Sequence, residues 1–219
     1  MRRARTARTR RGLPPIGERD LDILTLVGLC RFVTTLQVAR DLFPSEDRAR
    51  RRLRQLFDAK LVAVTLTSST QPNLISLTRE GHELIKAHRP ELAARIRRTG
   101  LIRLGELERH LLLVDARLYA AAWGEAHRAP LVRWTNNPVA FTAADALAEF
   151  DAGGEIATVA IRCDRPQERG ALLERLHTQV EGGVLRAVWV VTKTATRTFD
   201  VPWTRVLTMD VLLLRPLPR

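Results

Sequence analysis

Five arginines fall within seven residues of one predicted helix, at positions 48, 50, 51, 52 and 54. Residues 45–60 read SEDRARRRLRQLFDAK, in which Ser45 can cap the first turn and two acids follow it. At helical spacing one face is apolar and comprises Ala49, Leu53, Leu56 and Phe57. Arg50 and Arg54 flank that face. The other side presents Arg48, Arg51, Arg52 and Gln55.

This pattern of side chains has a specific chemistry. A guanidinium group contacts phosphates or donates paired hydrogen bonds to guanine, and a carboxamide can pair with adenine. We therefore predict that the helix reads the major groove of DNA. Its candidate contacts are Arg48, Arg51 and Arg52, with Gln55 as an adenine reader. The alternative is a charged helix face that only meets solvent.

The neighbouring elements favour the first interpretation. Residues 17–32 predict a helix with an apolar face, and residues 34–43 predict a short second helix that ends before Pro44. After the arginine-rich helix, a β-hairpin and a further helix are expected. This order predicts a winged helix-turn-helix domain over residues 18–90. The polar tip of its wing carries three candidate phosphate contacts, Ser68, Ser69 and Thr70.

The first 17 residues predict a flexible basic arm that precedes this domain. Residues 1–12 contain six arginines and no acid, and Arg2, Arg3 and Arg5 are candidate DNA contacts. Such arms can lie along phosphates or enter a minor groove, whereas a tail that only aids solubility is the alternative. The formal net charge is +12, and residues 1–60 contribute +8 of it. The position of the charge therefore points to nucleic acid more strongly than the arginine content does.

The rest of the chain predicts a helical connector over residues 91–127 and a small α/β domain over residues 128–219. The expected elements of that domain are strands at 131–134, 146–150 and 156–163, a helix at 166–180, and strands at 187–192 and beyond. A helix, three strands, a helix and a strand follow each other in the core of PD-(D/E)xK nucleases. That chemistry requires carboxylates that hold a metal ion and a lysine that assists the nucleophile.

The nuclease pattern is incomplete in this chain. Asp145 stands where the first acid belongs, but the third strand reads Ile161, Arg162, Cys163 instead of an acid-x-lysine pair. Asp164 follows without a lysine. We therefore predict a nuclease-like domain without catalysis, and no metal or other cofactor. A diverged metal-dependent endonuclease that uses Asp145 and Asp164 is the alternative.

The sequence also bears on where in the cell the protein is located. No apolar run reaches the roughly 20 residues that span a bilayer, and the N-terminus lacks the apolar region of a secretory signal. We expect a cytoplasmic protein with no membrane partner. Cys30 and Cys163 lie in apolar segments without zinc-site spacing, which predicts buried, reduced thiols.

Some stretches of the chain are similar to those of a known family. The specific ones are ERDLDIL, CRFVTTLQVARDLFP, RARRRLRQLFDAKLV and LTREG, and looser ones are RHLLLVDARL, ADALAEF, DRP, ALLERL and AVWVVT. In these stretches the chain resembles the plasmid replication-relaxation proteins, a family with a winged helix followed by an α/β domain. The resemblance implies a role in plasmid replication or DNA relaxation. The family often has proline-aspartate-alanine at 144–146, glutamate-x-aspartate-arginine at 162–165, and lysine and tyrosine at Arg175 and Gln179. These departures argue against catalysis.

Together these features predict a non-enzymatic, sequence-preferring protein that binds double-stranded DNA. It would serve a bacterial mobile element as an accessory or regulatory factor. An alternative is a winged-helix module that binds proteins of a replication, conjugation or transposition complex. A homodimer is also expected, because one winged helix covers only a short site. The helix around Leu107, Leu111, Val114 and Leu118 is apolar enough to serve the α/β domain and a second subunit.

Overall fold

The computed structural model describes residues 15–65, 72–96, 104–139, 143–163, 169–192 and 204–208. It is a mixed α+β protein with two small sheets, and it divides into two compact units, Met1–Gly100 and Leu101–Arg219. The boundary between the units falls inside the connector predicted at residues 91–127, and the long helix of that segment belongs to the second unit. Several predicted contacts lie outside the described residues, namely Arg2, Arg3, Arg5, Ser68, Ser69 and Thr70, as does Asp164.

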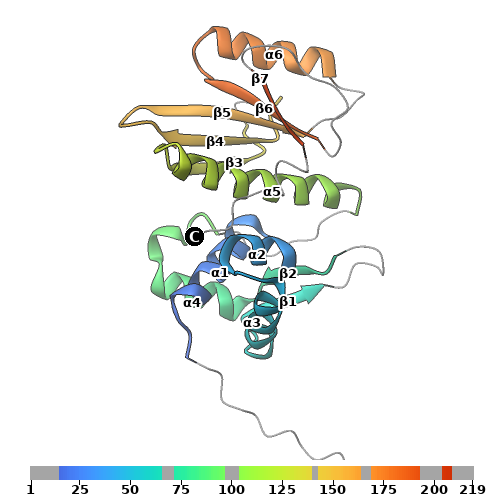
Figure 1. Cartoon of the computed structure of the whole chain (residues 1–219), viewed down its shortest axis with the longest axis vertical. Coiled ribbons are helices and arrows are strands. Elements are labelled where there is room, and N and C mark those ends of the chain that lie inside the picture. The colour runs from blue at the N-terminus through green and yellow to red at the C-terminus, as the bar shows by residue number, and fades with distance from the viewer. Residues whose placement is uncertain are drawn as a thin grey trace, which may run out of the picture. The chain divides into compact units, whose positions relative to one another are not determined.

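The first unit contains four α-helices, a two-stranded sheet and a short 3-10 helix within the described residues (Figure 1). In chain order these are α1 (Glu18–Cys30), α2 (Thr35–Leu42), α3 (Glu46–Asp58), β1 (Val62–Thr65), β2 (Leu74–Leu77), α4 (Arg79–His88) and η1 (Pro90–Leu92). The strands β1 and β2 pair antiparallel, with Val62 opposite Leu77. A third chain segment joins them, because Val33 and Ile75 exchange backbone hydrogen bonds of 3.0 and 2.8 Å.

Local sequence signals set the ends of these helices. Thr34 caps α2 through a reciprocal pair of bonds, in which its Oγ1 accepts from the Gln37 amide at 3.2 Å and Gln37 Oε1 accepts from the Thr34 amide at 3.0 Å. Ser45 stands at the N-cap of α3 as expected, but its side chain makes no capping hydrogen bond. Thr78 caps α4 by accepting from the Gly81 amide at 3.1 Å.

The core of this unit is built around α1. Helix α1 is buried on nearly all sides rather than on one face, and its most enclosed side chains include Ile23, Leu24 and Val27. Helix α3 contributes Leu53 and Leu56, which are 6% and 0% exposed. Phe57 was expected on the same apolar face but is 40% exposed, because it lies at the margin of the helix–core contact.

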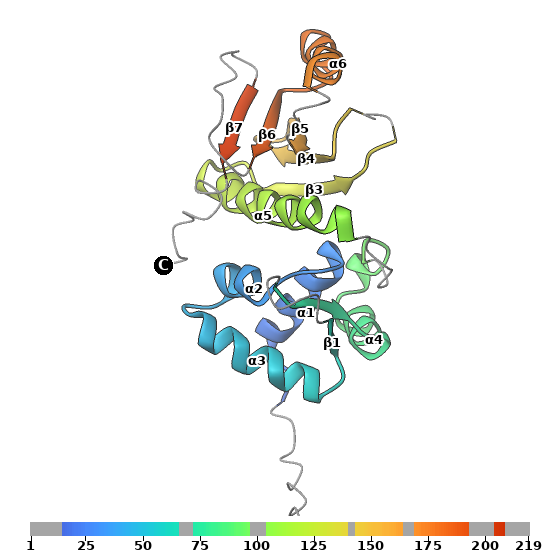
Figure 2. The same cartoon turned by 90° about the vertical axis from the view of Figure 1, so that its right-hand side faces the viewer.

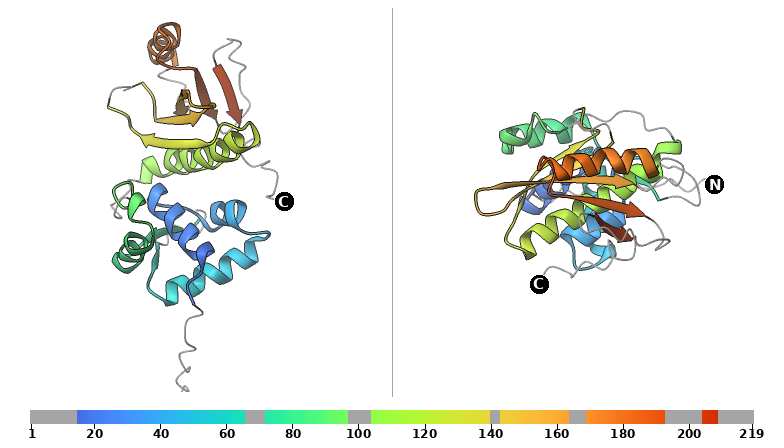
Figure 3. Two further views of the ribbon diagram at one scale, coloured as in Figure 1. Left: turned by 90° about the vertical axis from the view of Figure 1, so that its left-hand side faces the viewer. Right: turned by 90° about the horizontal axis from the view of Figure 1, so that it is seen from above.

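The second unit is a five-stranded sheet between two helices. Its elements are α5 (Leu104–Ala126), β3 (Leu131–Asn136), β4 (Ala146–Asp151), β5 (Ile156–Cys163), α6 (Arg169–Glu181), β6 (Ala187–Thr192) and β7 (Thr204–Thr208). The strand order is β3-β4-β5-β6-β7; the first three strands are antiparallel, and the last two continue parallel to β5. Helix α5 covers one face and α6 the other (Figures 2 and 3).

Each face of this sheet has its own apolar core. Against α5, Trp123, Phe150 and Trp189 contact one another with ring centroids 5.2 to 5.7 Å apart. Against the opposite face, Leu176 of α6 is fully buried with Leu147 and Val188. The helix predicted at 166–180 is observed as α6, and the expected turn between β4 and β5 is present. These contacts place α5 in the core of the second unit.

Candidate nucleic-acid interface

Helix α3 is fixed to the first unit along its inner face. Ala49 and Leu56 are fully buried and Leu53 nearly so, and the chain leaves the helix through a hydrogen bond of 2.9 Å from the Leu61 amide to the Leu56 carbonyl. The burial of these side chains holds the helix in one orientation. Its outer residues therefore form a surface of defined geometry.

One of the five arginines turns inward and acts as an anchor. The Arg52 guanidinium makes a two-point contact with the Asp20 carboxylate of α1, in which Nε donates to Oδ1 at 2.5 Å and Nη2 donates to Oδ2. The two side chains are only 19% and 4% exposed. Arg52 Nη1 also donates to Gln55 Oε1 at 2.7 Å. This network places the Arg52 guanidinium in an ion pair that joins α3 to α1.

The same network perturbs the titration of Asp20. Burial alone would raise the pKa of Asp20, but the hydrogen bonds from Arg52 and the Gly17 amide, with the charges of Arg52 and Arg19, outweigh it. The pKa of Asp20 therefore lies below its ordinary value of 3.8. The carboxylate is ionised at neutral pH and neutralises the charge of Arg52.

The other four arginines remain on the exposed surface of α3. Arg48 and Arg51 have no hydrogen-bond or ion-pair partner among the residues that the structure describes. Arg50 Nη2 lies 2.8 Å from Glu46 Oε1, and Arg54 Nε lies 3.3 Å from Asp58 Oδ1, both in exposed pairs within the helix. The four guanidinium groups can reach an external anion, because exposed ion pairs contribute only about 0–1 kcal/mol.

Three of the four predicted α3 contacts, Arg48, Arg51 and Gln55, are exposed, and Arg52 is the partly buried one. Arg52 is held in the ion pair with Asp20, whereas Gln55 only accepts one surface hydrogen bond from Arg52 through Oε1. Arg50 and Arg54, which were expected to flank the apolar face, are exposed as well. The sequence gives the positions of the arginines around the helix, but it does not tell which side of α3 stays uncovered by α1 and α2.

The second unit carries the other predicted site, at the start of β4. The Asp145 side chain is 2% exposed, and both of its oxygens accept from protein donors. Arg109 donates to Oδ1 from Nε at 2.8 Å and from Nη2 at 2.5 Å, and the Cys163 amide donates to Oδ2 at 2.6 Å. Arg162 Nη1 lies 3.5 Å from Oδ1. Arg109 also donates to Asn137 Oδ1 at 3.0 Å.

This arrangement does not fit a divalent cation. Magnesium binds oxygen ligands, and a catalytic metal pair requires several of them around an open position. Here the charged side chains nearest to Asp145 are two arginines, which neutralise the carboxylate and would repel a cation. Within the described ranges, no group of three or more His, Cys, Asp or Glu side chains could hold a metal ion. The described residues around Asp145 therefore form an ion-pair cluster.

Comparison with family models, curated proteins and solved structures found no match to this chain. Among the helices in the described parts of the chain, none combines the length and the apolar character needed to cross a bilayer.

Proposed function

We propose that the first unit binds double-stranded DNA with a sequence preference, as a winged helix-turn-helix domain. In this proposal α3 enters the major groove and the β1–β2 hairpin is the wing. The order α1, α2, α3, β1, β2, α4 supports it, as does the bridge between Val33 and Ile75 that joins the segment before α2 to the hairpin. The observation that carries the proposal is the exposed pair Arg48 and Arg51 on a helix whose inner face is fixed.

The charges of the side chains on α3 support the same role. The helix contains five arginines and three acids, and the Arg52 charge is neutralised by Asp20 from another helix. Arg48 and Arg51 are available for phosphate or guanine without breaking an existing contact. Arg50 and Arg54 can exchange their exposed acidic neighbours for phosphate at little cost.

We further propose that the second unit is a non-catalytic, nuclease-like domain. The order of α5, β3, β4, β5, α6 and β6 supports the nuclease-like part of this proposal, and the pairing of Asp145 with Arg109 and Arg162 supports the non-catalytic part. The resemblance to replication-relaxation proteins suggests an accessory or regulatory role for a bacterial mobile element. Incubation of the protein with supercoiled or linear DNA and magnesium or manganese tests this part of the proposal. Cleavage that disappears in Asp145→Ala would show that the domain is an enzyme.

The DNA-binding proposal is tested by comparing two double variants of equal net charge. Selection from a random duplex library gives the preferred site, and fluorescence anisotropy measures affinity for that site. Arg48→Ala with Arg51→Ala should weaken specific binding by about 2–6 kcal/mol, because each good arginine contact to a base contributes about 1–3 kcal/mol.

The matched control removes two exposed arginines of the same unit that lie outside α3. Arg79→Ala with Arg95→Ala lowers the net charge by the same amount and should reduce affinity far less. Equal losses in the two variants would mean that only net charge matters and would refute α3 as the reader. Failure to select any duplex would refute DNA binding and favour the protein-interaction alternative. Light scattering with and without the selected duplex tests the expected homodimer.

A further inference from the structure

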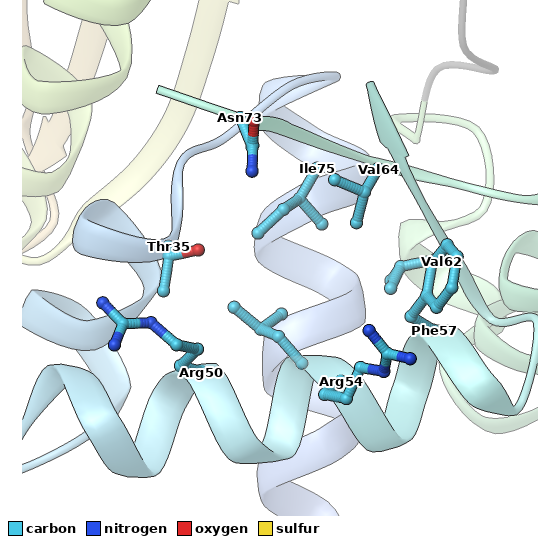
Figure 4. A pocket seen from close by; sticks show the side chains of 9 residues that line it. Thr35, Arg50, Arg54, Phe57, Val62, Val64, Asn73 and Ile75 are labelled. Atoms are coloured by element: carbon cyan, nitrogen blue, oxygen red, sulfur yellow. The ribbon is translucent and has the colours of Figure 1, made fainter. Parts of the chain in front are cut away.

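A groove of about 390 Å³ lies between α3 and the β1–β2 hairpin (Figure 4). Its apolar floor is formed by Leu53, Val62 and Ile75, which are 6%, 2% and 2% exposed. These three side chains come from α3, β1 and β2, so that the floor is part of the core of the first unit. The full lining comprises Thr35, Arg50, Leu53, Arg54, Phe57, Val62, Val64, Asn73 and Ile75.

Two large apolar side chains remain open to solvent at the groove. Phe57 and Val64 are each 40% exposed, although both lie next to the apolar floor. Apolar surface in contact with water costs roughly 25 cal/mol per Å² relative to burial. A bound apolar group would cover the Phe57 ring and the Val64 methyl groups. The groove thus offers apolar surface to a ligand without requiring the core to open.

The rim of the groove is cationic on the side of α3. Arg50 and Arg54 are one helical turn apart, and the Arg54 guanidinium carbon lies 5.7 Å from the centroid of the Phe57 ring. Figure 4 shows both arginines on α3, with Asn73 on the opposite side of the groove. Thr35 and Asn73 add a hydroxyl and a carboxamide to the lining. Charged and polar groups therefore surround an apolar floor.

The acidic neighbours of the rim do not close it to an anion. Arg50 is paired with Glu46 and Asp47, and Arg54 with Asp58, and all five side chains are at least 45% exposed. Such exposed pairs are weak and exchange readily. A guanidinium has five donors, and it can bind a ligand carboxylate through two parallel hydrogen bonds. A carboxylate next to an apolar surface gains more from this contact than an exposed Asp or Glu.

We propose that this groove binds a small organic carboxylate with a flat apolar body. The carboxylate pairs with Arg50 and Arg54, and the apolar body covers Phe57 and Val64 above the floor. The groove volume is within the range of small-molecule sites, which are largely apolar with a few polar groups that fix orientation. This site goes beyond DNA binding and is tested without DNA, because Arg50 and Arg54 are also the residues proposed to contact phosphate.

The test uses the full chain and 2-naphthoate as the probe, with binding measured by isothermal titration calorimetry. Arg54→Gln and Arg50→Gln should each weaken binding about tenfold, because a charge-assisted hydrogen bond is lost. The matched controls Arg48→Gln and Arg51→Gln remove the same charge from the same helix outside the groove and should bind the probe as the wild type does. The uncharged analogue 2-naphthalenemethanol should also bind about tenfold more weakly.

A second variant tests the apolar half of the site. Phe57→Ser removes a partly exposed ring, so the fold should persist, as a thermal melt will verify, while naphthoate affinity falls. No binding at millimolar probe would overturn the proposal. Equal losses in the groove and control variants would also overturn it, because they would reveal nonspecific attraction to a basic helix. Unchanged affinity in folded Phe57→Ser would exclude the apolar contact that the site requires.

Discussion

Replacing Arg52 by alanine should destabilise the first unit although the residue lies in the arginine-rich stretch of α3. The change removes the guanidinium that makes the two-point contact with Asp20 and leaves a carboxylate that is only 4% exposed. It also removes the donor to Gln55. Among the residues that the structure describes, the donor that remains to Asp20 is the Gly17 amide, at 2.9 Å.

The expected size follows from the burial of the pair. Removing one partner of a buried ion pair costs about 3–5 kcal/mol, because an uncompensated charge remains. The Arg52 side chain is 19% exposed, so water can reach part of the site and the lower end, about 3 kcal/mol, applies. Replacing the exposed Arg51 by alanine should change stability by no more than about 0.5 kcal/mol.

The loss should depend on pH in a defined direction. The pKa of Asp20 lies below 3.8 in the folded protein, so its ionised form contributes stability that is fully present above pH 3.8. That contribution is lost as the pH falls from 3.8 through the folded pKa. Without Arg52, burial of Asp20 favours its protonated form. The stability difference between wild type and Arg52→Ala should therefore shrink in acid.

Urea unfolding with two optical probes measures this change. Far-ultraviolet circular dichroism follows both units, whereas all four tryptophans, Trp123, Trp134, Trp189 and Trp203, lie in the second unit. With a slope of about 1–3 kcal/mol per molar urea, the circular dichroism transition of the first unit should move down by about 1–3 M. The tryptophan transition should not move. Equal stability of Arg52→Ala and Arg51→Ala would refute the anchoring role of Arg52.

Four further predictions concern other parts of the chain. Gly81→Ala should destabilise the first unit by about 1–3 kcal/mol, because a Cβ there would lie 2.1 Å from a backbone oxygen. Gly105→Ala, where a Cβ meets nothing within 4 Å, should instead stabilise the second unit by about 0.5–1 kcal/mol in the same urea assay. Arg109→Gln should lower the free energy of unfolding of the second unit, followed by tryptophan fluorescence, by about 3 kcal/mol, because Asp145 is left with fewer donors. An unchanged unfolding transition would contradict the structural role of Arg109. Deletion of residues 1–12 should weaken binding to all duplexes and flatten its dependence on salt concentration, since fewer counterions are released. An unchanged salt slope would count against an arm–phosphate contact.

Several elements could be read from local sequence. Pro44 predicted the end of α2, and helical spacing placed Leu53 and Leu56 of α3 in the core. The Asp-Ala-Gly-Gly segment predicted the turn between β4 and β5, where Gly153 and Gly154 have φ angles of +79° and +98°. These features depend on residues a few positions apart, so their causes are present in short stretches of sequence.

The roles of individual charged residues depended on the tertiary structure. Helical spacing placed Arg52 on the same side as Arg48 and Arg51, but it could not show that Asp20, 32 residues away, meets the guanidinium. Arg109 likewise reaches Asp145 across 36 residues. Phe57 shares the spacing of the apolar face, yet packing leaves it at the groove. Sequence periodicity determines which residues share a helix face, whereas the packing of distant segments determines which of them are buried, paired or exposed.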